Sequence, residues 1–373
     1  MAKGIHSTDA IVIGGGLHGC SSALYLAQAG LSVIVLEKDT VGRHASTANA
    51  GGVRRLGRAL PEIPLAQAAL ECWQQISDLV DHDCGFTGSC QIKVAETEAE
   101  LAALQKRHAT LVELGYSHEE LIDAQQLREL LPTIAPHCVG GMAVYGDGHA
   151  NPFLTQHAFK RKAASHGVRF IENCPVIGIS KRADTWLIKT PLADLEAPVL
   201  VNCAGAWGGQ MAAMLGEFAP VEAMAYMLMI TARVKPFVEP VVGSQGRTLS
   251  FKQFNNGTVM IGGGYQGRVE PDSIRTHLNF RGLAESAATA RALFPNLSGV
   301  PVVRCWAGIE GETPDHIPVI GASAQAGAYH AFGFSGHGFA LSPIVGKVIA
   351  ELVTQGESEL PIEAFSIGRF VNS

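Results

Sequence analysis

The feature that most constrains the fold of this chain is the pattern between residues 10 and 38. An apolar run at residues 10–13 is short and rich in β-branched side chains, as in a buried parallel strand. Three glycines with the spacing G-x-G-x-x-G follow it, and apolar residues then recur at helical intervals. Gly30 predicts a helix stop, and an apolar run at residues 31–36 predicts a second strand that ends on Glu37. The pattern therefore predicts a strand–helix–strand unit.

The three glycines of this unit, Gly14, Gly16 and Gly19, have different physical roles. Gly14 allows a tight turn, Gly16 lets a pyrophosphate approach the backbone, and Gly19 lets the helix pack close to the strand. Glu37, about 20 residues further on, would accept hydrogen bonds from the ribose of an adenosine. Its negative charge disfavours a ribose 2′-phosphate, and hence NADP. Because the strands, the helix, the glycines and the acid occur together, we predict a dinucleotide-binding site.

Length and composition limit the remaining classes of protein. A chain of 373 residues is longer than one hydrophobic core usually becomes, which predicts two domains. The formal net charge of -6, without a basic run, argues against nucleic-acid binding. The eight cysteines are scattered, which predicts no metal site and is typical of reduced thiols in a cytoplasmic protein. We expect no signal peptide, and no transmembrane segment because no apolar run approaches the roughly 20 residues that span a bilayer.

The order of the predicted elements indicates an α/β fold whose nucleotide-binding part is assembled from separate segments. A strand at residues 199–202 runs into the sequence CAGAW and a helix, far from the first glycine motif. Residues 224–234 and 248–262, with Asn256-Gly257 as a turn, predict an antiparallel sheet in a second domain. We interpret the sequence GGGY at 262–265 as the end of a strand, and residues 65–80 as one amphipathic helix.

Two further loops have the composition of a ring- or phosphate-binding segment. The first, after the second strand, combines small and polar residues: Ser46, Asn49, Gly51 and Gly52. Small residues let a backbone pass close to a bound ring, and polar ones can hold phosphate or ring heteroatoms. The second contains Gly336, His337 and Gly338 between an apolar strand and a helix. Backbone N–H groups at a helix start stabilise negative charge, such as that at the N1 and O2 edge of a reduced flavin.

With these motifs the chain resembles the FAD-dependent amine and amino-acid oxidoreductases, a family that includes D-amino-acid oxidase, glycine oxidase and sarcosine oxidase. Five segments carry the resemblance in order: IVIGGGLHG with LEK, ASTANAGGVR, VNCAGAW, RCWAGIEGETPDHIPVIG and GFSGHGFALSPIVGK. The resemblance implies a Rossmann-like FAD-binding domain and a mixed α+β substrate domain built on an antiparallel sheet. It also implies hydride transfer from a substrate α-carbon to flavin N5, giving an imine that water hydrolyses. The implied domains are residues 1–85, 147–220 and 300–373 for FAD, and 86–146 and 221–299 for the substrate.

The resemblance also assigns cofactor-binding residues by their place in the motifs. The adenosine diphosphate part of FAD would contact Gly14, Gly16, Gly19, Glu37 and Lys38. The pyrophosphate and the ring would lie along Ser46, Asn49, Gly51 and Gly52, and the flavin pyrimidine would face Gly336, His337 and Gly338. The backbone of Val176 would contact the adenine side, and the cofactor crevice would be lined by Ala204, Gly205 and Trp207.

The chain departs from the simple oxidases at several positions. Gly308 stands where sarcosine oxidase carries the cysteine that binds flavin covalently, so we predict noncovalent FAD. Glu310 replaces a carboxylate-binding arginine of glycine oxidase, and Ala340 replaces a carboxylate-binding lysine. Met260 or Ile261 occupies the position of the lysine that promotes reaction with oxygen in sarcosine oxidase. The segment W-A-G-I-E-G-x-T-P-D looks more like flavoprotein subunits of bacterial dye-linked dehydrogenases for D-hydroxyproline, proline and opines, which often form hetero-oligomers.

Four charged residues are candidates for contact with the substrate. Arg54 and Arg55 follow Gly51 and Gly52 of the loop at residues 46–52, the flavin loop, and could hold a carboxylate bidentately. The alternative is that they are surface or phosphate-side arginines. Arg304, on a predicted core strand, is the next candidate. Glu310 is interpreted either as an acid that recognises the substrate amine or as a polar rim residue. We assign no general base, because an amine that binds in its neutral form does not require one.

These observations predict an FAD-dependent dehydrogenase that acts on a small amino or imino acid, such as a D-amino acid, hydroxyproline or an opine-like compound. Reduction of oxygen begins with one-electron transfer, and a nearby cation stabilises the superoxide formed. Because that cation is missing from the family position, electrons are expected to pass to a dye, a quinone or a partner subunit. The alternatives are a true oxidase that forms hydrogen peroxide and a non-catalytic FAD-binding subunit. A flavin monooxygenase is disfavoured, since the sequence shows no second phosphate-binding loop for NAD(P)H.

Overall fold

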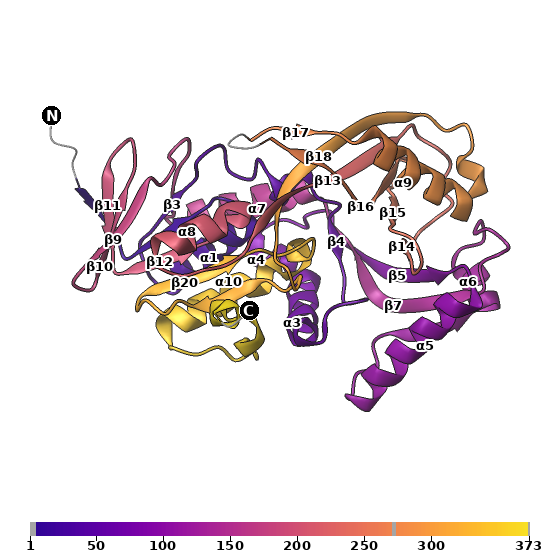
Figure 1. Cartoon of the computed structure of the whole chain (residues 1–373), viewed down its shortest axis with the longest axis horizontal. Helices are drawn as coiled ribbons and strands as arrows, with labels where there is room; N and C mark the ends of the chain where they lie inside the picture. The colour runs from indigo at the N-terminus through magenta and orange to yellow at the C-terminus, as the bar shows by residue number, and fades with distance from the viewer. Residues whose placement is uncertain (1–4, 271–273, 372–373) are drawn as a thin grey trace.

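A computed structural model describes residues 5–270 and 274–371 and shows a mixed α/β fold built on three sheets (Figure 1). The first has six strands in the order β19–β20–β12–β2–β3–β8. These strands are β19 (Val319–Ala322), β20 (Ala328–Phe332), β12 (Val199–Asn202), β2 (Ala10–Ile13), β3 (Val33–Leu36) and β8 (Arg169–Ile171). Neighbouring strands are parallel except β19 and β20. The predicted assembly of this sheet from separate segments of the chain is thus confirmed.

The predicted strand–helix–strand unit is also confirmed, with α1 (Leu17–Gln28) between β2 and β3. Gly14 and Gly30 have φ values of +103° and +91°, in the left-handed region that favours glycine. One face of the sheet, including Val12 and Val35, packs under α1, α3 (Ile63–Gln74), α7 (Pro152–Ser165) and α10 (Gly338–Thr354). This core fixes the helix start that follows the glycine motif.

The opposite face of the six-stranded sheet carries the alternate residues of the same strands, among them Ile11 and Ile34. They pack against Trp186 and Ile188 of a small sheet with the order β1–β11–β10–β9. Its strands are β1 (Ile5–Ser7), β11 (Asp194–Ala197), β10 (Thr185–Lys189) and β9 (Gly178–Arg182). Both faces of the parallel sheet are therefore buried, as expected from its continuous apolar runs.

The third sheet has ten strands and lies in the other half of the molecule (Figure 1). Its main path is β18 (Val302–Glu312), β13 (Glu222–Thr231), β16 (Val259–Val269), β15 (Ser250–Gln253), β14 (Val241–Ser244), β5 (Thr87–Ala95), β7 (Gly140–His149) and β4 (Gly52–Val53). Two short strands join its sides, β17 (Thr276–His277) beside β16 and β6 (Glu120–Asp123) beside β7. All described pairs are antiparallel except β14 and β5. The predicted antiparallel sheet is confirmed.

Strands β4 and β18 join this sheet although they come from segments that the sequence assigned to FAD binding. The division of the chain into two domains at the boundaries given above stays a proposal, and its outermost residues, 1–4 and 372–373, lie outside the described residues, as do 271–273.

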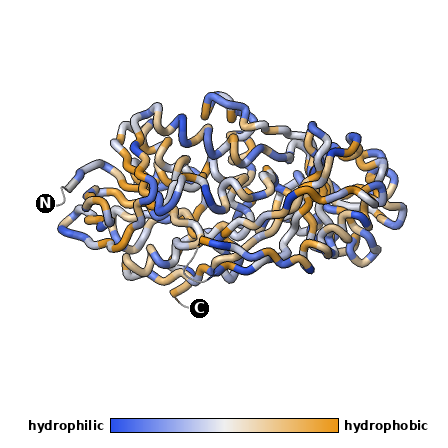
Figure 2. The backbone as a smooth tube through the Cα atoms, turned by 90° about the horizontal axis from the view of Figure 1, so that it is seen from above, coloured by the Kyte–Doolittle hydropathy of each residue, from blue (hydrophilic) through white to orange (hydrophobic). Residues whose placement is uncertain are grey.

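Strand alternation decides which side chains of the ten-stranded sheet face the interior of the molecule. On β5, Ile92 and Val94 pack in a core beneath α6 (Ala124–Leu130) and α9 (Phe280–Leu293), so Gln91 and Lys93 point to the other face. That second face is covered in part by α5 (Glu98–Glu113), whose Leu104 packs in a smaller apolar cluster. Figure 2 shows that apolar segments run through both halves of the molecule.

Two local predictions require correction. The helix expected over residues 65–80 is broken into α3 and α4 (Ile76–Val80). The sequence GGGY does not end a strand, because β16 continues to Val269. Gly263 has φ +125° and passes so close to the residue before β15 that a Cβ on it would lie 2.5 Å from the Cα of Leu249. The predicted Asn256-Gly257 turn is confirmed between β15 and β16, with φ +88° at Gly257.

The remaining elements are short. They are α2 (Ala45–Ala48), α8 (Gly208–Met214) and the 3-10 segments η1 (Leu60–Glu62), η2 (Gly205–Trp207), η3 (Pro295–Leu297), η4 (Glu363–Phe365) and η5 (Ile367–Phe370). All eight cysteines are free thiols. Within the described ranges there is neither a helix that could cross a membrane nor a cluster of three His, Cys, Asp or Glu side chains that could hold a metal ion.

Candidate active site

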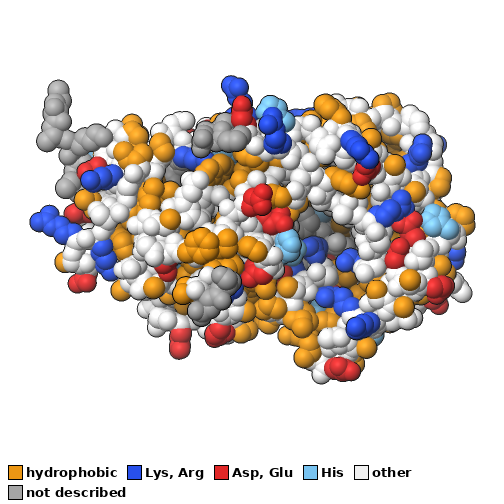
Figure 3. Space-filling model, viewed as in Figure 1, with side chains coloured by type: hydrophobic (Ala, Val, Ile, Leu, Met, Phe, Trp, Pro, Cys, Tyr) orange, Lys and Arg blue, Asp and Glu red, His pale blue; other side chains and the backbone are white. Residues whose placement is uncertain are grey.

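A cavity of about 970 Å³ lies between the six-stranded and the ten-stranded sheet. It is visible as a deep hollow with basic side chains at its floor (Figure 3). Most of the predicted cofactor residues line it: Gly14, Gly16, Glu37, Lys38, Ser46, Asn49, Gly51, Gly52, Val176, Ala204, Gly205, Trp207, Gly336, His337 and Gly338. Gly19 lies behind the wall, where a Cβ would collide with the carbonyl of Gly14, in agreement with its packing role.

At one end of the cavity the glycine motif exposes bare backbone. Gly14 packs directly against the carbonyl of Cys203, with which a Cβ would collide, whereas a Cβ on Gly16 would lie 3.0 Å from Ser46 Oγ. The same Ser46 Oγ accepts a hydrogen bond of 2.8 Å from the backbone N–H of Leu17, at the start of α1. This cradle, which a side chain would fill, fits the pyrophosphate of a dinucleotide.

Glu37 is held where a ribose would lie. Its carboxylate is 7% exposed and accepts hydrogen bonds from the backbone N–H groups of Gly15, at 2.7 Å, and Asp39, at 2.9 Å. Burial raises the pKa of Glu37, and these two hydrogen bonds oppose that rise. The geometry keeps the carboxylate fixed in the wall, and each oxygen has a further lone pair for a hydroxyl.

Aromatic and basic side chains close the wall beside Glu37. The Lys38 Nζ lies 2.8 Å from the centre of the Trp207 ring, and burial lowers the pKa of Lys38 to about 8. The His44 ring lies 4.9 Å from Trp207, and its buried Nε2 has no hydrogen-bond partner in the described structure. His18, stacked on Phe334, also has a buried nitrogen, Nδ1, without a partner in that part of the chain. Because both histidines line the cavity, these nitrogens fit a bound polar ligand.

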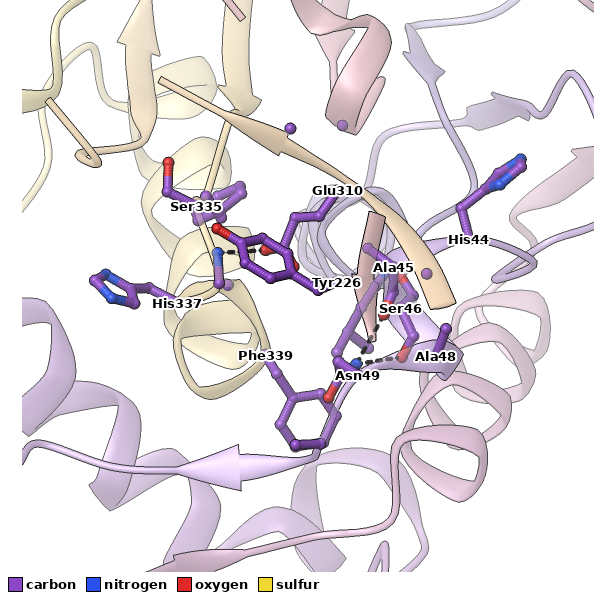
Figure 4. A pocket seen from close by; sticks show the side chains of 18 of the residues that line it. His44, Ala45, Ser46, Ala48, Asn49, Tyr226, Glu310, Ser335, His337 and Phe339 are labelled. Atoms are coloured by element: carbon purple, nitrogen blue, oxygen red, sulfur yellow. Dashed lines mark hydrogen bonds between the residues drawn. The ribbon is translucent and has the colours of Figure 1, made fainter. Parts of the chain in front are cut away.

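The loop after α2 is shaped by its own asparagine (Figure 4). Asn49 Nδ2 donates hydrogen bonds of 2.9 Å to the carbonyls of Ala45 and Ser46, and its Oδ1 accepts one of 2.6 Å from the N–H of Gly51. Gly51 has φ +68°. The Asn49 side chain therefore forms hydrogen bonds within its own loop and stabilises the conformation of that loop, a role that the sequence motif alone did not reveal.

The other end of the cavity is the start of α10. Helix α10 begins at Gly338 with His337 as its N-cap residue, as predicted. The N–H of Gly336 points at the Glu310 carboxylate and donates a hydrogen bond of 2.6 Å to it (Figure 4). His337 Nδ1 lies 3.0 Å from a carboxylate oxygen of Glu62, which anchors the loop from behind.

Glu310 is half-buried on β18 and lines the cavity, so the structure favours a pocket acid over a rim residue. Burial raises the pKa of Glu310 to about 7, while the N–H of Gly336 acts in the opposite direction. The Tyr226 hydroxyl, on neighbouring β13, donates a hydrogen bond of 2.6 Å to Glu312. An acid that titrates near neutral pH beside a cavity is able to exchange a proton with a ligand.

The structure separates the three predicted arginines. Arg54 lines the cavity, where its Nη1 donates to the carbonyl of Leu56. Arg55 points the other way, with Nε 3.0 Å from Asp147 Oδ1 and Nη2 2.7 Å from the carbonyl of Tyr145. Adjacent residues of an extended segment point to opposite sides, so only one of the two reaches the cavity. Arg304 is exposed on the outer part of β18. Arg55 and Arg304 are thus not among the residues that line the cavity, and substrate contact by either stays a prediction.

Several residues in or behind the cavity wall were missed by the sequence reasoning. Lys93, Tyr226 and Arg58 line the cavity, and Arg58 forms an ion pair with Glu62. Gln91 and Lys93 alternate with the apolar core residues Ile92 and Val94, and this alternation could have predicted that Lys93 points away from the core. Arg58 and Glu62 carry the i,i+4 spacing of an ion pair, although nothing in the sequence places that pair beneath α10.

Met260 and Ile261 lie on opposite faces of the ten-stranded sheet. Ile261 packs with Phe251 in the core of that sheet, so Met260 points to the other face. Met260 stands directly opposite Lys252 on neighbouring β15, and paired side chains share one face. Lys252 is 3% exposed, and its Nζ donates to the carbonyl of Ala50 in the flavin loop. A buried amine therefore lies one strand away from the position where the family lysine is missing.

Comparison with known proteins identifies the family. Residues 9–352 match the model of the family described as FAD dependent oxidoreductase. The chain belongs to this family. This FAD-dependent oxidoreductase is 26% identical to a subunit of the opine oxidase of Rhizobium meliloti over 377 residues, which cover 98% of each chain. It is also 26% identical to glycine oxidase of Geobacillus kaustophilus over 376 residues, again 98% of each. The resemblance stated from the sequence is thus confirmed.

The fold of this FAD-dependent oxidoreductase matches that of L-proline dehydrogenase from P.horikoshii, with a TM-score of 0.90 and 26% identity over 99% of both chains. The family and the cavity agree on the cofactor, because the glycine cradle, Glu37 and the start of α10 fit the parts of FAD in order. At Gly308, a Cβ would lie 2.6 Å from the Cβ of Ala48, so the position expected to lack a flavin-linking cysteine has no room for one.

Proposed function

We propose that this FAD-dependent oxidoreductase oxidises a small amino or imino acid at the bond between its nitrogen and its α-carbon. The proposal depends on the position of Arg54. This arginine lines the cavity beside the flavin loop, and its guanidinium has no carboxylate partner among the described residues. A guanidinium can donate two parallel hydrogen bonds to a carboxylate, which makes it a specific site for an amino-acid carboxylate. The names of the relatives, an opine oxidase, a glycine oxidase and a proline dehydrogenase, support this substrate class.

The chain's own part in the reaction follows from the two ends of the substrate. Bound FAD supplies the acceptor for the hydride that leaves the α-carbon, and the imine that remains is hydrolysed by water. Arg54 holds the carboxylate and so fixes the α-carbon. Glu310, whose pKa burial raises to about 7, receives the ammonium proton near neutral pH and leaves the nitrogen lone pair free. The cavity wall, which has both polar and apolar side chains, orients the substrate between Arg54 and Glu310.

The apolar Met260 supports an acceptor other than oxygen. A cation at this position would stabilise superoxide, and its replacement by a thioether removes that charge. We therefore propose that the protein is a dehydrogenase that passes electrons to a quinone, a dye or a partner subunit. The relative from Rhizobium meliloti is named as one subunit of an opine oxidase, which supports a partner chain.

Lys252 favours a second candidate, a true oxidase that forms hydrogen peroxide. Its amine lies on the same face as Met260 and could stabilise superoxide in place of the family lysine. Burial lowers the pKa of Lys252 to about 7, so the amine carries its charge below that pH. An oxidase that depends on Lys252 would react with oxygen faster at pH 6 than at pH 9.

The proposed function is tested by mixing the holoenzyme without oxygen with both enantiomers of proline, hydroxyproline and alanine, and with sarcosine. We expect at least one of them to bleach the oxidised flavin without NAD(P)H. Bleaching only with NAD(P)H would indicate a monooxygenase, and no bleaching by any amino or imino acid would indicate a non-catalytic subunit.

The acceptor is tested by timing reoxidation of the substrate-reduced enzyme in air-saturated buffer and with an artificial dye. A dehydrogenase reoxidises rapidly with the dye alone. Oxygen matching the dye in rate, with stoichiometric peroxide, would establish the oxidase, and Lys252→Met should then slow the oxygen reaction and leave flavin reduction unchanged. Lys181→Met, which changes an exposed lysine on β9, is the matched control.

A further inference from the structure

The end of the cavity beyond the flavin loop carries more positive charge than its own carboxylates balance. Three arginines near this end each have a carboxylate partner, and Arg58 is the one of them that lines the cavity. Arg58 Nη1 lies 3.4 Å from Glu62 Oε1, Arg107 Nε lies 2.6 Å from Glu119 Oε2, and Arg55 Nε lies 3.0 Å from Asp147 Oδ1. These three carboxylates are fully buried and committed to their partners.

Arg54 and Lys93 are the two cations that line the cavity there without such a partner. Over the described residues, neither has a carboxylate within ion-pair distance, and Arg54 donates only to the carbonyl of Leu56. The two cationic groups flank the same glycine, since a Cβ on Gly57 would lie 3.4 Å from Lys93 Nζ and 3.7 Å from Arg54 Nη1. Both side chains are only partly exposed.

Holding two like charges together in a partly buried wall is unfavourable unless something neutralises them. Burial and the charge of Arg54 lower the pKa of Lys93, and burial and the charge of Arg58 lower the pKa of Arg54. An apolar side chain at position 93 would line the cavity without this cost, as Ile92 and Val94 fill the other face of the same strand. The pair therefore fits a site whose occupant brings negative charge.

We infer that the substrate carries a second carboxylate, so that it is an amino or imino dicarboxylic acid, an inference that rests on the proposed function. The α-carboxylate of an amino acid balances Arg54, and Glu310 is the counter-charge for its amine. Lys93 then remains without a partner unless the occupant carries a further anion. Lys93 reaches the cavity from β5 and Arg54 from the loop after β4, so each cation can bind one carboxylate of a small dianion that lies between them.

The inference is tested with two thioethers that cannot form an imine. Thiodiacetate and (methylthio)acetate differ only in the second carboxymethyl group, and their binding to the holoenzyme is measured by titration calorimetry. We expect thiodiacetate to bind about 10- to 100-fold more tightly, the range of one charge-assisted hydrogen bond. In Lys93→Met this preference should vanish while the affinity for (methylthio)acetate is unchanged. Lys93→Arg should retain most of it.

Lys106→Met, an exposed lysine on α5, is the matched control and should keep the wild-type preference. Equal affinity of the wild type for both thioethers would overturn the inference. An equal loss of affinity for both thioethers in Lys93→Met would also overturn the inference, because Lys93 would then bind the α-carboxylate together with Arg54. FAD content verifies that each variant is folded, and Lys93→Gln replaces Lys93→Met if the latter loses FAD.

Oxidation is measured separately with sarcosine and iminodiacetate, which differ by the same carboxylate. If thiodiacetate is preferred through Lys93 but no amino or imino acid reduces the flavin, the proposed function fails and the dianion site stands. If sarcosine reduces the flavin as efficiently as iminodiacetate, as judged by kcat/KM, the proposed function stands and the dicarboxylate substrate is refuted.

Discussion

Replacing Glu62 by alanine should destabilise the protein and loosen the loop at the start of α10. Glu62 and Arg58 are 0% and 1% exposed and lie beneath that loop. The Glu62 carboxylate accepts hydrogen bonds from Arg58 at 3.4 Å, from His337 Nδ1 at 3.0 Å and from the N–H of Ala59 at 3.4 Å. Alanine removes all three and leaves the guanidinium of Arg58 buried without a counter-ion.

The expected cost is about 3 kcal/mol, the lower end of the roughly 3–5 kcal/mol for breaking a buried ion pair from one side. The lower end applies because Arg58 keeps two acceptors, the carbonyls of Arg54 at 3.1 Å and His337 at 3.2 Å. Glu62→Gln retains an acceptor for His337 and should cost less than Glu62→Ala. The double variant Arg58→Met, Glu62→Leu removes both charges and should also cost less, since nothing charged is left buried.

The free energy of unfolding is measured by urea titration of the holoenzyme, followed by circular dichroism and by the flavin fluorescence that appears on release. The flavin transition should shift with the protein transition, because His337 belongs to the cavity wall. Glu71→Ala, an exposed glutamate on α3, is the control and should change stability by no more than about 0.5 kcal/mol. A cost below about 1 kcal/mol for Glu62→Ala, or a double variant less stable than it, would refute the reasoning.

Three further predictions follow from the cavity wall. Arg54→Ala should keep FAD but lose roughly 2–4 kcal/mol of transition-state binding, measured as kcat/KM. Arg55→Ala should leave kcat/KM unchanged and lower the free energy of unfolding, because Asp147 is left buried without its cation. Equal losses of kcat/KM in both variants would contradict the assignment. Burial raises the pKa of Glu310 from 4.5 to about 7, so the folded state binds more protons than the unfolded state between these values, and the contribution of Glu310 to stability falls as pH rises from 4.5 through 7. Glu310→Gln should abolish that component of the dependence of stability on pH, and also the change in kcat/KM near pH 7. If both pH profiles are the same in the variant as in the wild type, Glu310 does not titrate in this range. Acid precipitation should release free FAD, since Gly308 offers no thiol and no space for one; flavin retained on the denatured chain would disprove the noncovalent assignment.

The amino-acid sequence by itself determined the elements whose signal is local. The strand at 10–13, the glycines, the helix and the acid at Glu37 were all predicted in their observed places, because each depends on periodicity or on backbone space within one short segment. The hairpin at Asn256-Gly257 was predicted for the same reason, since a turn that needs positive φ selects its residues locally. Even the cofactor follows from such local motifs once their order along the chain is considered.

Only the tertiary structure decided which charged side chains meet in the cavity. Arg54 and Arg55 are neighbours in an extended segment, and nothing local distinguishes the one that faces the cavity from the one that binds Asp147. Lys252 and Met260 share a face because β15 and β16 pair in one register, which a sequence comparison of position 260 alone does not reveal. Lys93 lies near Arg54 only because β4 and β5 both pair with β7, which brings together segments that are distant in the sequence. Local periodicity fixes how side chains alternate along a strand, whereas the side of the strand that becomes the cavity wall depends on contacts between distant segments.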